Sequence, residues 1–316
     1  MGFFRVNRSD GIRVTSADPL VTMMPYLFRT RTESIVYYKR TIPIDEIQKY
    51  IVEQRRKGTR ITMFSIIVAA MLQTVYRRPN MNRFIAGCRM YMHKNFEVLY
   101  TVKQSLTDDG LESVAKVRLN PEDTIFNVAQ AMSEHTHNIK KGELKEDDKL
   151  IRFFCHMPRW FIRTFMTLLR FLDFYGWMPQ SLIDALPFYS TVFISHLGSL
   201  GAEAPFHHLY EFGTNSIFVT IGRTYEVPYK GEDGKIEWRR SIDLAFTVDE
   251  RICDGFYLIS SLKMLEQFML NPCLLEYPAK DLIDIHYPKT WPEKARQHYH
   301  TMGEFGKKIE SREDLQ

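Results

Sequence analysis

An alternating segment that runs straight into a helical segment, within residues 241–269, most constrains how this chain can fold. In residues 241–248 every second side chain is apolar, which is the two-residue period of a half-buried strand. Over residues 258–269 apolar side chains recur at helical spacing, which places them on one face of a helix. The intervening residues 249–257 therefore form a strand-to-helix junction, where a sheet ends and side chains can be presented to a ligand.

A second segment also joins a strand to a turn. Residues 191–197 (Thr-Val-Phe-Ile-Ser-His-Leu) are largely apolar and predict a strand. Gly198 and Gly201 follow, and glycines permit another stretch of backbone to approach closely. Ser195 lies near the end of this strand, so we expect its hydroxyl at an edge of the sheet.

Both segments resemble one known superfamily. Asp-Glu-Arg-Ile-Cys-Asp-Gly (249–255) resembles the Asp-His-Arg-x-x-Asp-Gly motif of dihydrolipoamide acyltransferase catalytic domains and the His-His-x-x-x-Asp-Gly motif of chloramphenicol acetyltransferases. Phe-Ile-Ser-His-Leu-Gly (193–198) resembles the Phe-x-Ile-Ser-x-Leu-Gly segment of the former group. Pro79 and Asn82 match its Pro-x-x-Asn turn. The chain thus resembles the chloramphenicol acetyltransferase-like superfamily, closest to the catalytic domain of 2-oxo acid dehydrogenase dihydrolipoamide acyltransferases, over about residues 30–275.

The resemblance implies a fold and an assembly. The implied fold is α/β, a chloramphenicol-acetyltransferase-like two-layer sandwich in which helices flank a mixed sheet. We expect one acyltransferase-like domain in residues 1–277, with an aromatic and basic insertion at 150–190, and a polar C-terminal tail at 278–316. The resemblance also implies a homotrimer whose sites lie between subunits, with a coenzyme A thioester as co-substrate and no bound cofactor or metal.

Three residues fall on the family's functional positions. Ser195 matches the serine that stabilises the tetrahedral oxyanion, and Asp254 matches the acidic residue that supports the loop. Glu250 stands where the family has the histidine that acts as general base. A carboxyl group is a weak base at neutral pH unless burial raises its pKa. Neighbouring Asp249 would raise that pKa only if both side chains faced one pocket, and Arg251 would lower it.

Four other side chains could serve as base or nucleophile. His196 follows Ser195 and points to the opposite face if the strand continues. His207 and His208 lie in a loop that could bring them inward, although paired loop histidines are usually solvated. Cys253 is expected in the core rather than as a nucleophile.

Two functions therefore remain open from the sequence. One is transfer of an acyl group from coenzyme A to a thiol, hydroxyl or amine, with Glu250 as an atypical base. The other is a catalytically inactive homologue that binds acyl-coenzyme A or another pantetheine-like molecule, or that serves in assembly.

The insertion at 150–190 combines many aromatic residues with arginines. Arg159, Arg163 and Arg170 lie near one helical face, opposite much of the aromatic set. Such a helix packs on the protein itself or a partner subunit, closes over a pocket as a lid, or lies on a membrane surface. We favour packing.

Composition narrows the alternatives further. The 42 basic residues against 38 acidic ones leave too little positive charge to indicate nucleic-acid binding. Four cysteines without paired short spacings predict neither a zinc site nor a disulfide framework, which favours a reducing cytoplasmic location. No apolar run is long enough to span a membrane.

Further elements follow from the same patterns. Residues 1–33 are expected to be irregular because Asp18-Pro19 and Pro25 interrupt them. We expect strands at 34–40, 84–92, 96–104, 111–118 and 216–224, a hairpin at 225–238, and helices at about 43–57, 62–76, 120–141 and 151–178.

Overall fold

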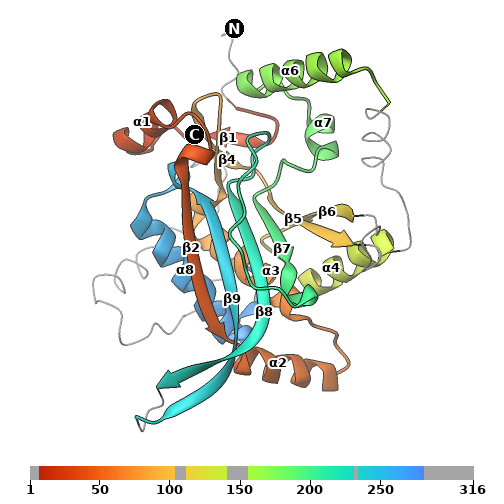
Figure 1. The fold of residues 1–316 in the computed structure, drawn as a ribbon, viewed down its shortest axis with the longest axis vertical. Coiled ribbons are helices and arrows are strands. Elements are labelled where there is room, and N and C mark those ends of the chain that lie inside the picture. Colours follow the sequence, from red (N-terminus) through yellow and green to blue (C-terminus); the bar gives the residue numbers. More distant parts are fainter. Residues whose placement is uncertain (1–6, 104–111, 141–155, 231–233, 281–316) are drawn as a thin grey trace.

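A six-stranded mixed sheet is the centre of the molecule (Figure 1). The computed structural model describes residues 7–103, 112–140, 156–230 and 234–280. The strand order is β2-β9-β8-β7-β5-β6, and β7 runs parallel to both β5 and β8 while the other pairs are antiparallel. The strands are β2 (Ile35–Pro43), β5 (Phe96–Lys103), β6 (Glu112–Leu119), β7 (Val192–His196), β8 (Ile217–Lys230) and β9 (Ile236–Asp249). The predicted mixed sheet flanked by helices is confirmed.

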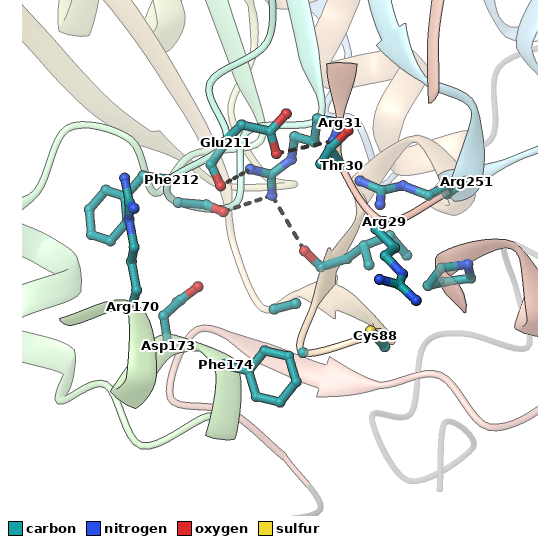
Figure 2. Close-up of a pocket in the computed structure, with 15 residues that line it drawn as sticks. Arg29, Thr30, Arg31, Cys88, Arg170, Asp173, Phe174, Glu211, Phe212 and Arg251 are labelled. Atoms are coloured by element: carbon teal, nitrogen blue, oxygen red, sulfur yellow. Dashed lines mark hydrogen bonds between the residues drawn. The ribbon is translucent and has the colours of Figure 1, made fainter. Parts of the chain in front are cut away.

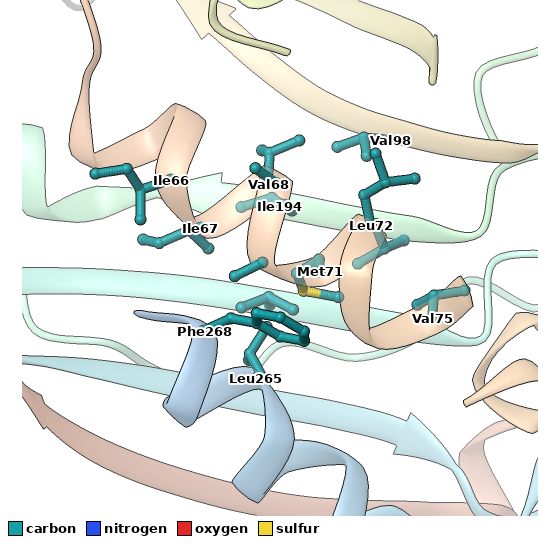
Figure 3. Close-up of a cluster of buried hydrophobic side chains, with 14 of the residues drawn as sticks. Ile66, Ile67, Val68, Met71, Leu72, Val75, Val98, Ile194, Leu265 and Phe268 are labelled. Atoms are coloured by element: carbon teal, nitrogen blue, oxygen red, sulfur yellow. The ribbon is translucent and has the colours of Figure 1, made fainter. Parts of the chain in front are cut away.

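Helices cover one face of this sheet and supply most of the core. They are α2 (Asp45–Arg56), α3 (Met63–Arg77), α4 (Ile125–Lys140) and α8 (Gly255–Leu270). Thr62 caps α3 by accepting a hydrogen bond from the Ser65 backbone. Every residue of α3 from 65 to 75 is buried, because this helix lies between the strands and α8 (Figure 3). The prediction of a helix buried nearly all round is confirmed.

Alternation along β7 assigns its side chains to two faces. Val192 and Ile194 belong to the main core on the helical side. Phe193 belongs to a second cluster with Leu99, Leu209 and Phe218 on the other side. Because successive strand residues point to opposite faces, Ser195 shares the face of Phe193.

The N-terminal third contains more regular structure than the sequence predicted. Residues 1–33 were expected to be irregular, yet β1 (Gly11–Arg13) and α1 (Pro19–Leu27) form there. Asp18 caps α1 and Pro19 occupies its first turn, so residues interpreted as breakers instead begin a helix.

The predicted strand at 84–92 is also wrong. It is two antiparallel strands, β3 (Arg83–Ala86) and β4 (Arg89–His93), and with β1 they form a separate three-stranded sheet. Gly87 and Cys88 both have left-handed backbone angles, with φ of 56° and 58°. Two consecutive left-handed residues reverse the chain, so a continuous strand cannot form.

The described part of the insertion forms two helices, α6 (Arg159–Tyr175) and α7 (Gln180–Ala185). Apolar residues of α6 pack with α7 in a cluster centred on Leu169, Met178, Ile183 and Tyr189, separate from the main core. The α6 helix lies beyond the end of the large sheet rather than over its face (Figure 1). Four of its apolar side chains are exposed: Trp160, Leu168, Phe171 and Phe174.

The β8–β9 hairpin extends well past the body of the protein (Figure 1). Both strands are longer than predicted, since the expected hairpin at 225–238 continues the ladder of the core strands. Most residues from 223 to 230 and from 236 to 240 are exposed. The remaining short elements are the 3-10 turns η1 (Thr32–Ser34), η2 (Pro79–Asn82), η3 (Leu197–Leu200), η4 (Glu250–Ile252) and η5 (Pro272–Glu276).

Two predictions fall partly outside the described residues. Residues 150–155 of the insertion and 281–316 of the C-terminal tail are not described. In the described ranges, none of the helices has the length and apolar character needed to cross a bilayer.

Candidate functional site

A buried ion pair fixes the strand-to-helix junction. Asp249 is the last residue of β9 and is fully buried. Its carboxylate accepts hydrogen bonds from Arg251 Nε at 2.8 Å and Nη2 at 2.7 Å, and from Ser34 Oγ at 3.1 Å. Arg251 also donates to the Phe28 carbonyl. This two-pronged pair holds the chain in the η4 turn immediately after the sheet.

Glu250, the candidate base, begins that turn. Its side chain is half-buried, and it makes no hydrogen bond or ion pair within the part of the chain that the structure describes. Asp249 turns inward to Arg251, so its charge is already compensated. The carboxylate of Glu250 is therefore left available at the junction.

Asp254 has a local structural role. Its carboxylate accepts a hydrogen bond of 2.9 Å from the Tyr257 backbone and so caps α8. Capping satisfies a donor that the first helical turn leaves unpaired. The side chain is exposed, and its hydrogen bond joins the end of the loop that carries Glu250 to the first turn of α8.

Ser195 lies at the end of β7, opposite Thr220 of β8. Its hydroxyl is half-buried and has no hydrogen-bond partner in the described ranges. The turn that follows is tightly packed, because a Cβ on Gly198 would collide with the Gly222 carbonyl oxygen. Close backbone approach at Gly198 is thus confirmed, and it fixes the position of Ser195 relative to β8.

The same anchoring reaches the start of β7. The Thr191 hydroxyl donates to the Asn82 side-chain oxygen at 2.9 Å, and Asn82 ends the η2 turn that Pro79 begins. The Pro-x-x-Asn turn therefore holds the serine-bearing strand as well as ending a helix.

Within one chain, Ser195 and Glu250 are separated both across the strands and along them. Ser195 pairs with Thr220, and Thr220 pairs with Ala245 of β9. Glu250 lies five positions after Ala245, just past the end of β9. At the spacing of residues in a strand, this offset along the strand direction is about 15 Å. The structure does not bring the two side chains together in a single protomer.

The candidate histidines are separated by the sheet. The ring of His196 stacks on Phe64 of α3, with ring centroids 6.2 Å apart, on the helical side. His207 stacks on Phe218 at 4.1 Å, on the face that Ser195 shares. Of these two histidines, His207 is therefore the one on the serine's face of the sheet.

Cys253 is a core residue. It is 5% exposed, and burial raises the pKa of its thiol to about 12. A thiol with so high a pKa is protonated at neutral pH and is a poor nucleophile. This agrees with the prediction from sequence.

Sequence reasoning missed a cavity beside the junction. Its volume is about 480 Å³, and Arg29, Arg31, Arg170 and Arg251 line it together with Cys88 (Figure 2). Arg31 is buried and donates to the carbonyls of Tyr210 and Gly213 at 2.7 Å. Burial lowers the pKa of Arg31, although nearby Asp249 opposes this effect. The arginines come from three distant segments (29–31, 170 and 251), so no local pattern marks the cavity.

Solved structures with this architecture are known. The catalytic dihydrolipoamide acetyltransferase of Azotobacter vinelandii matches with a TM-score of 0.55 and 15% identity, covering 83% of this chain and 93% of that chain. The cubic core of a pyruvate dehydrogenase multienzyme complex matches with a TM-score of 0.55 and 14% identity, covering 81% and 88%.

The chain has the fold of dihydrolipoamide acetyltransferase catalytic cores. A truncated catalytic core of the 2-oxoacid dehydrogenase multienzyme complex from Thermoplasma acidophilum is a third match, with a TM-score of 0.52, 13% identity, and coverage of 82% and 98%. No protein-family model matches the sequence, and no curated protein matches it significantly. The predicted acyltransferase-like fold is thus confirmed by three-dimensional structure rather than by sequence similarity.

Proposed function

We propose that this protein transfers an acyl group from a coenzyme A thioester to a thiol, hydroxyl or amine acceptor, at a site shared between neighbouring copies in a homotrimer. The observation that carries the proposal is the arrangement of Ser195 and Glu250. Each has a polar group without a partner among the described residues, and the two are separated along the sheet and on strands that are not neighbours. A site that uses both requires two copies of the chain.

The proposed mechanism is acyl transfer through a tetrahedral intermediate. Glu250 accepts the proton of the acceptor as the acceptor attacks the thioester carbonyl carbon. The Ser195 hydroxyl of the neighbouring copy donates a hydrogen bond to the oxyanion that develops. The intermediate then collapses, the carbon–sulfur bond breaks, and coenzyme A leaves with the proton held by Glu250. The products are the acylated acceptor and free coenzyme A.

The enzyme from Azotobacter vinelandii supports these assignments. Its structure was studied for the role of a serine, a histidine and an asparagine in the catalytic mechanism, and the asparagine follows the histidine by four positions. Here Asp254 follows Glu250 by the same interval. On this spacing we propose that Glu250 takes the position of the histidine and Asp254 that of the asparagine.

Release of coenzyme A measures the activity directly. The purified protein is mixed with acetyl-coenzyme A and a panel of thiol, hydroxyl and amine acceptors, and free coenzyme A is followed by chromatography. We expect Ser195→Ala to lower the rate by about 100-fold, as for loss of one oxyanion donor. Ser199→Ala removes an exposed hydroxyl four residues away and is expected to be neutral. If wild-type protein releases no more coenzyme A than Ser195→Ala does, the proposal of acyl transfer is wrong.

Glu250 can be tested by replacing it with the side chain that the family uses. Imidazole has a pKa near 7 and is a stronger base than a carboxylate. Glu250→His should therefore increase the rate at pH 7 by about tenfold, whereas Glu250→Gln should abolish the base. Equal rates for the wild type and both variants would exclude a role for Glu250 in proton transfer.

The presence of glutamate at this position favours a second candidate function. A domain that keeps the fold but lacks imidazole would bind acyl-coenzyme A without transferring the acyl group. Calorimetry with coenzyme A and acetyl-coenzyme A distinguishes the candidates when combined with the rate assay. Binding without turnover supports a binding module, and absence of binding at millimolar concentration excludes both.

A further inference from the structure

The cavity next to the junction has features of an anion-binding site. It lies between the end of α1, the β3–β4 turn, the C-terminal part of α6 and the loop at 211–213 (Figure 2). Neither Ser195 nor Glu250 nor Asp254 lines it. A volume of about 480 Å³ lies within the usual range for small-molecule sites.

Two buried arginines form the rigid wall of this cavity. Arg31 and Arg251 are each 3% exposed. Backbone carbonyls and Asp249 hold their guanidinium groups in place. Nε of Arg31 has no hydrogen-bond partner among the described residues, and it lies 3.9 Å from the Asp249 carboxylate. Asp249 neutralises one of these two charges, so the wall carries a single fixed positive charge.

Two further arginines reach the cavity from its rim. The side chains of Arg29 and Arg170 are exposed, and neither guanidinium group forms a hydrogen bond or ion pair within the described ranges. They come from opposite sides, one from the segment after α1 and the other from α6. Both guanidinium groups are therefore available to a ligand.

The carboxylates of the lining are already engaged elsewhere. Asp173 accepts hydrogen bonds from Arg8 at 2.7 Å and from the Tyr189 hydroxyl at 2.9 Å. Glu211 accepts from the backbone of Arg31 and from the backbone and hydroxyl of Thr32. Asp249 neutralises Arg251, so the other three guanidinium groups face two carboxylates that already have hydrogen-bond partners, and the cavity favours an anion.

We propose that this cavity binds a phosphate-bearing small ligand, with Arg29 and Arg170 gripping the phosphate against the wall formed by Arg31 and Arg251. Guanidinium groups present paired donors that match phosphate oxygens. Phe174 and Ile85 also line the cavity and offer apolar contact to the rest of the ligand. The proposal does not depend on acyl transfer, because it uses other residues.

Cys88 supplies a built-in reporter of this site. It is the only non-glycine residue in the described ranges with a left-handed backbone, and it lines the cavity. Cys273 is exposed elsewhere and provides an internal reference thiol. Both cysteines can be followed in one sample by peptide mass spectrometry.

The first experiment compares alkylation by anionic iodoacetate and neutral iodoacetamide. Local positive charge should concentrate the anion, so the ratio of the two rate constants should be about fivefold higher at Cys88 than at Cys273. In the double variant Arg29→Gln with Arg170→Gln, the ratio at Cys88 should fall to the ratio at Cys273. Arg163→Gln changes an exposed arginine of α6 outside the cavity, and it should leave the ratio at Cys88 as high as in the wild type. Equal ratios in the wild-type protein would overturn the proposal.

The second experiment identifies the source of the phosphate. Soluble pyrophosphate, and vesicles of phosphatidylcholine with or without phosphatidic acid, are each tested for protection of Cys88 from iodoacetamide. The vesicles are included because α1 exposes Leu20, Met23 and Leu27 next to the cavity. Protection by pyrophosphate indicates a soluble ligand, and protection only by phosphatidic acid vesicles indicates a lipid headgroup. We expect the double arginine variant to weaken protection about tenfold. If neither pyrophosphate nor the phosphatidic acid vesicles protect Cys88, the proposal is wrong.

Discussion

At the residue scale, the pair formed by Asp249 and Arg251 determines how the candidate site is presented. Both side chains are buried and joined by two short contacts. Because this pair turns Asp249 inward, the next residue, Glu250, is the carboxylate left without a partner at the junction among the described residues. The sequence motif therefore encodes one structural carboxylate and one available carboxylate in adjacent positions.

Breaking this pair should destabilise the fold. Asp249→Asn leaves the buried Arg251 without a charged partner, so we expect the free energy of unfolding to fall by about 3 kcal/mol. Urea denaturation followed by circular dichroism measures the change. Glu237→Gln removes a partner from the exposed pair with Arg239 and should cost less than about 1 kcal/mol. Similar losses in the two variants would contradict the structural role of Asp249.

His93 should make stability depend on pH. Burial lowers the pKa of His93 from 6.5 to about 4, and its ring packs at a tilt against Phe84, with ring centroids 4.3 Å apart. Between these two values the unfolded chain binds a proton that the folded chain does not. Stability should therefore fall as the pH falls through this range, by up to about 1.4 kcal/mol per pH unit from this group.

Comparison with His93→Phe isolates this contribution. The phenyl ring retains a partner for Phe84 but does not titrate. The difference in unfolding free energy between wild type and variant is measured by urea denaturation at several values from pH 7.5 to 4.5. A constant difference would show that His93 is not the group responsible.

At the element scale, the central sheet and its helices could be predicted because their patterns are local. The alternation in β9 and the apolar face of α8 lie within single short segments. The break between β3 and β4 could not be predicted in this way. A turn of two left-handed residues usually contains Asn-Gly or Asp-Gly, whereas here Gly87 precedes Cys88.

In the candidate site, too, only the residues with a local sequence pattern could be predicted. Ser195, Glu250 and Asp254 could be selected from their motifs, and the cap that Asp254 provides is visible in the helix start. The arginine cavity could not be found, because Arg31 and Arg251 meet only through the tertiary fold. The long separation of Arg29 from Arg170 likewise leaves no periodic signal.

The turn after β7 depends on the absence of a side chain at Gly198. In Gly198→Ala the new methyl group would collide with the Gly222 carbonyl, so the η3 turn must move away from β8 next to Ser195. We expect a loss of about 2 kcal/mol in stability, measured by urea denaturation. Gly255→Ala is the matched control, because a Cβ there meets nothing within 4 Å. A neutral Gly198→Ala variant would contradict the close approach.

At the scale of the whole molecule, the projecting hairpin is a candidate contact for assembly. Ile236 and Trp238 are exposed, at 70% and 66%, on one face of this hairpin. Apolar side chains on a projecting arm are typical of a surface covered by another copy. We therefore expect the proposed homotrimer to use this arm.

Trp238→Glu should weaken that assembly. A buried, unpaired charge at an interface is costly, so light scattering after size exclusion should show a shift from trimer towards monomer. Glu226→Gln changes an exposed residue of the partner strand and should leave the trimer intact. A trimer unaffected by Trp238→Glu would place the contact elsewhere.

The most direct test of a shared site mixes two inactive variants. Ser195→Ala and Glu250→Gln are each expected to lose nearly all acyl transfer, and their chains are co-expressed so that they assemble together. If each site takes Ser195 from one copy and Glu250 from the next, random mixing restores about a quarter of the wild-type rate. If both residues act within one copy, the mixture stays as inactive as its parents and the account is wrong.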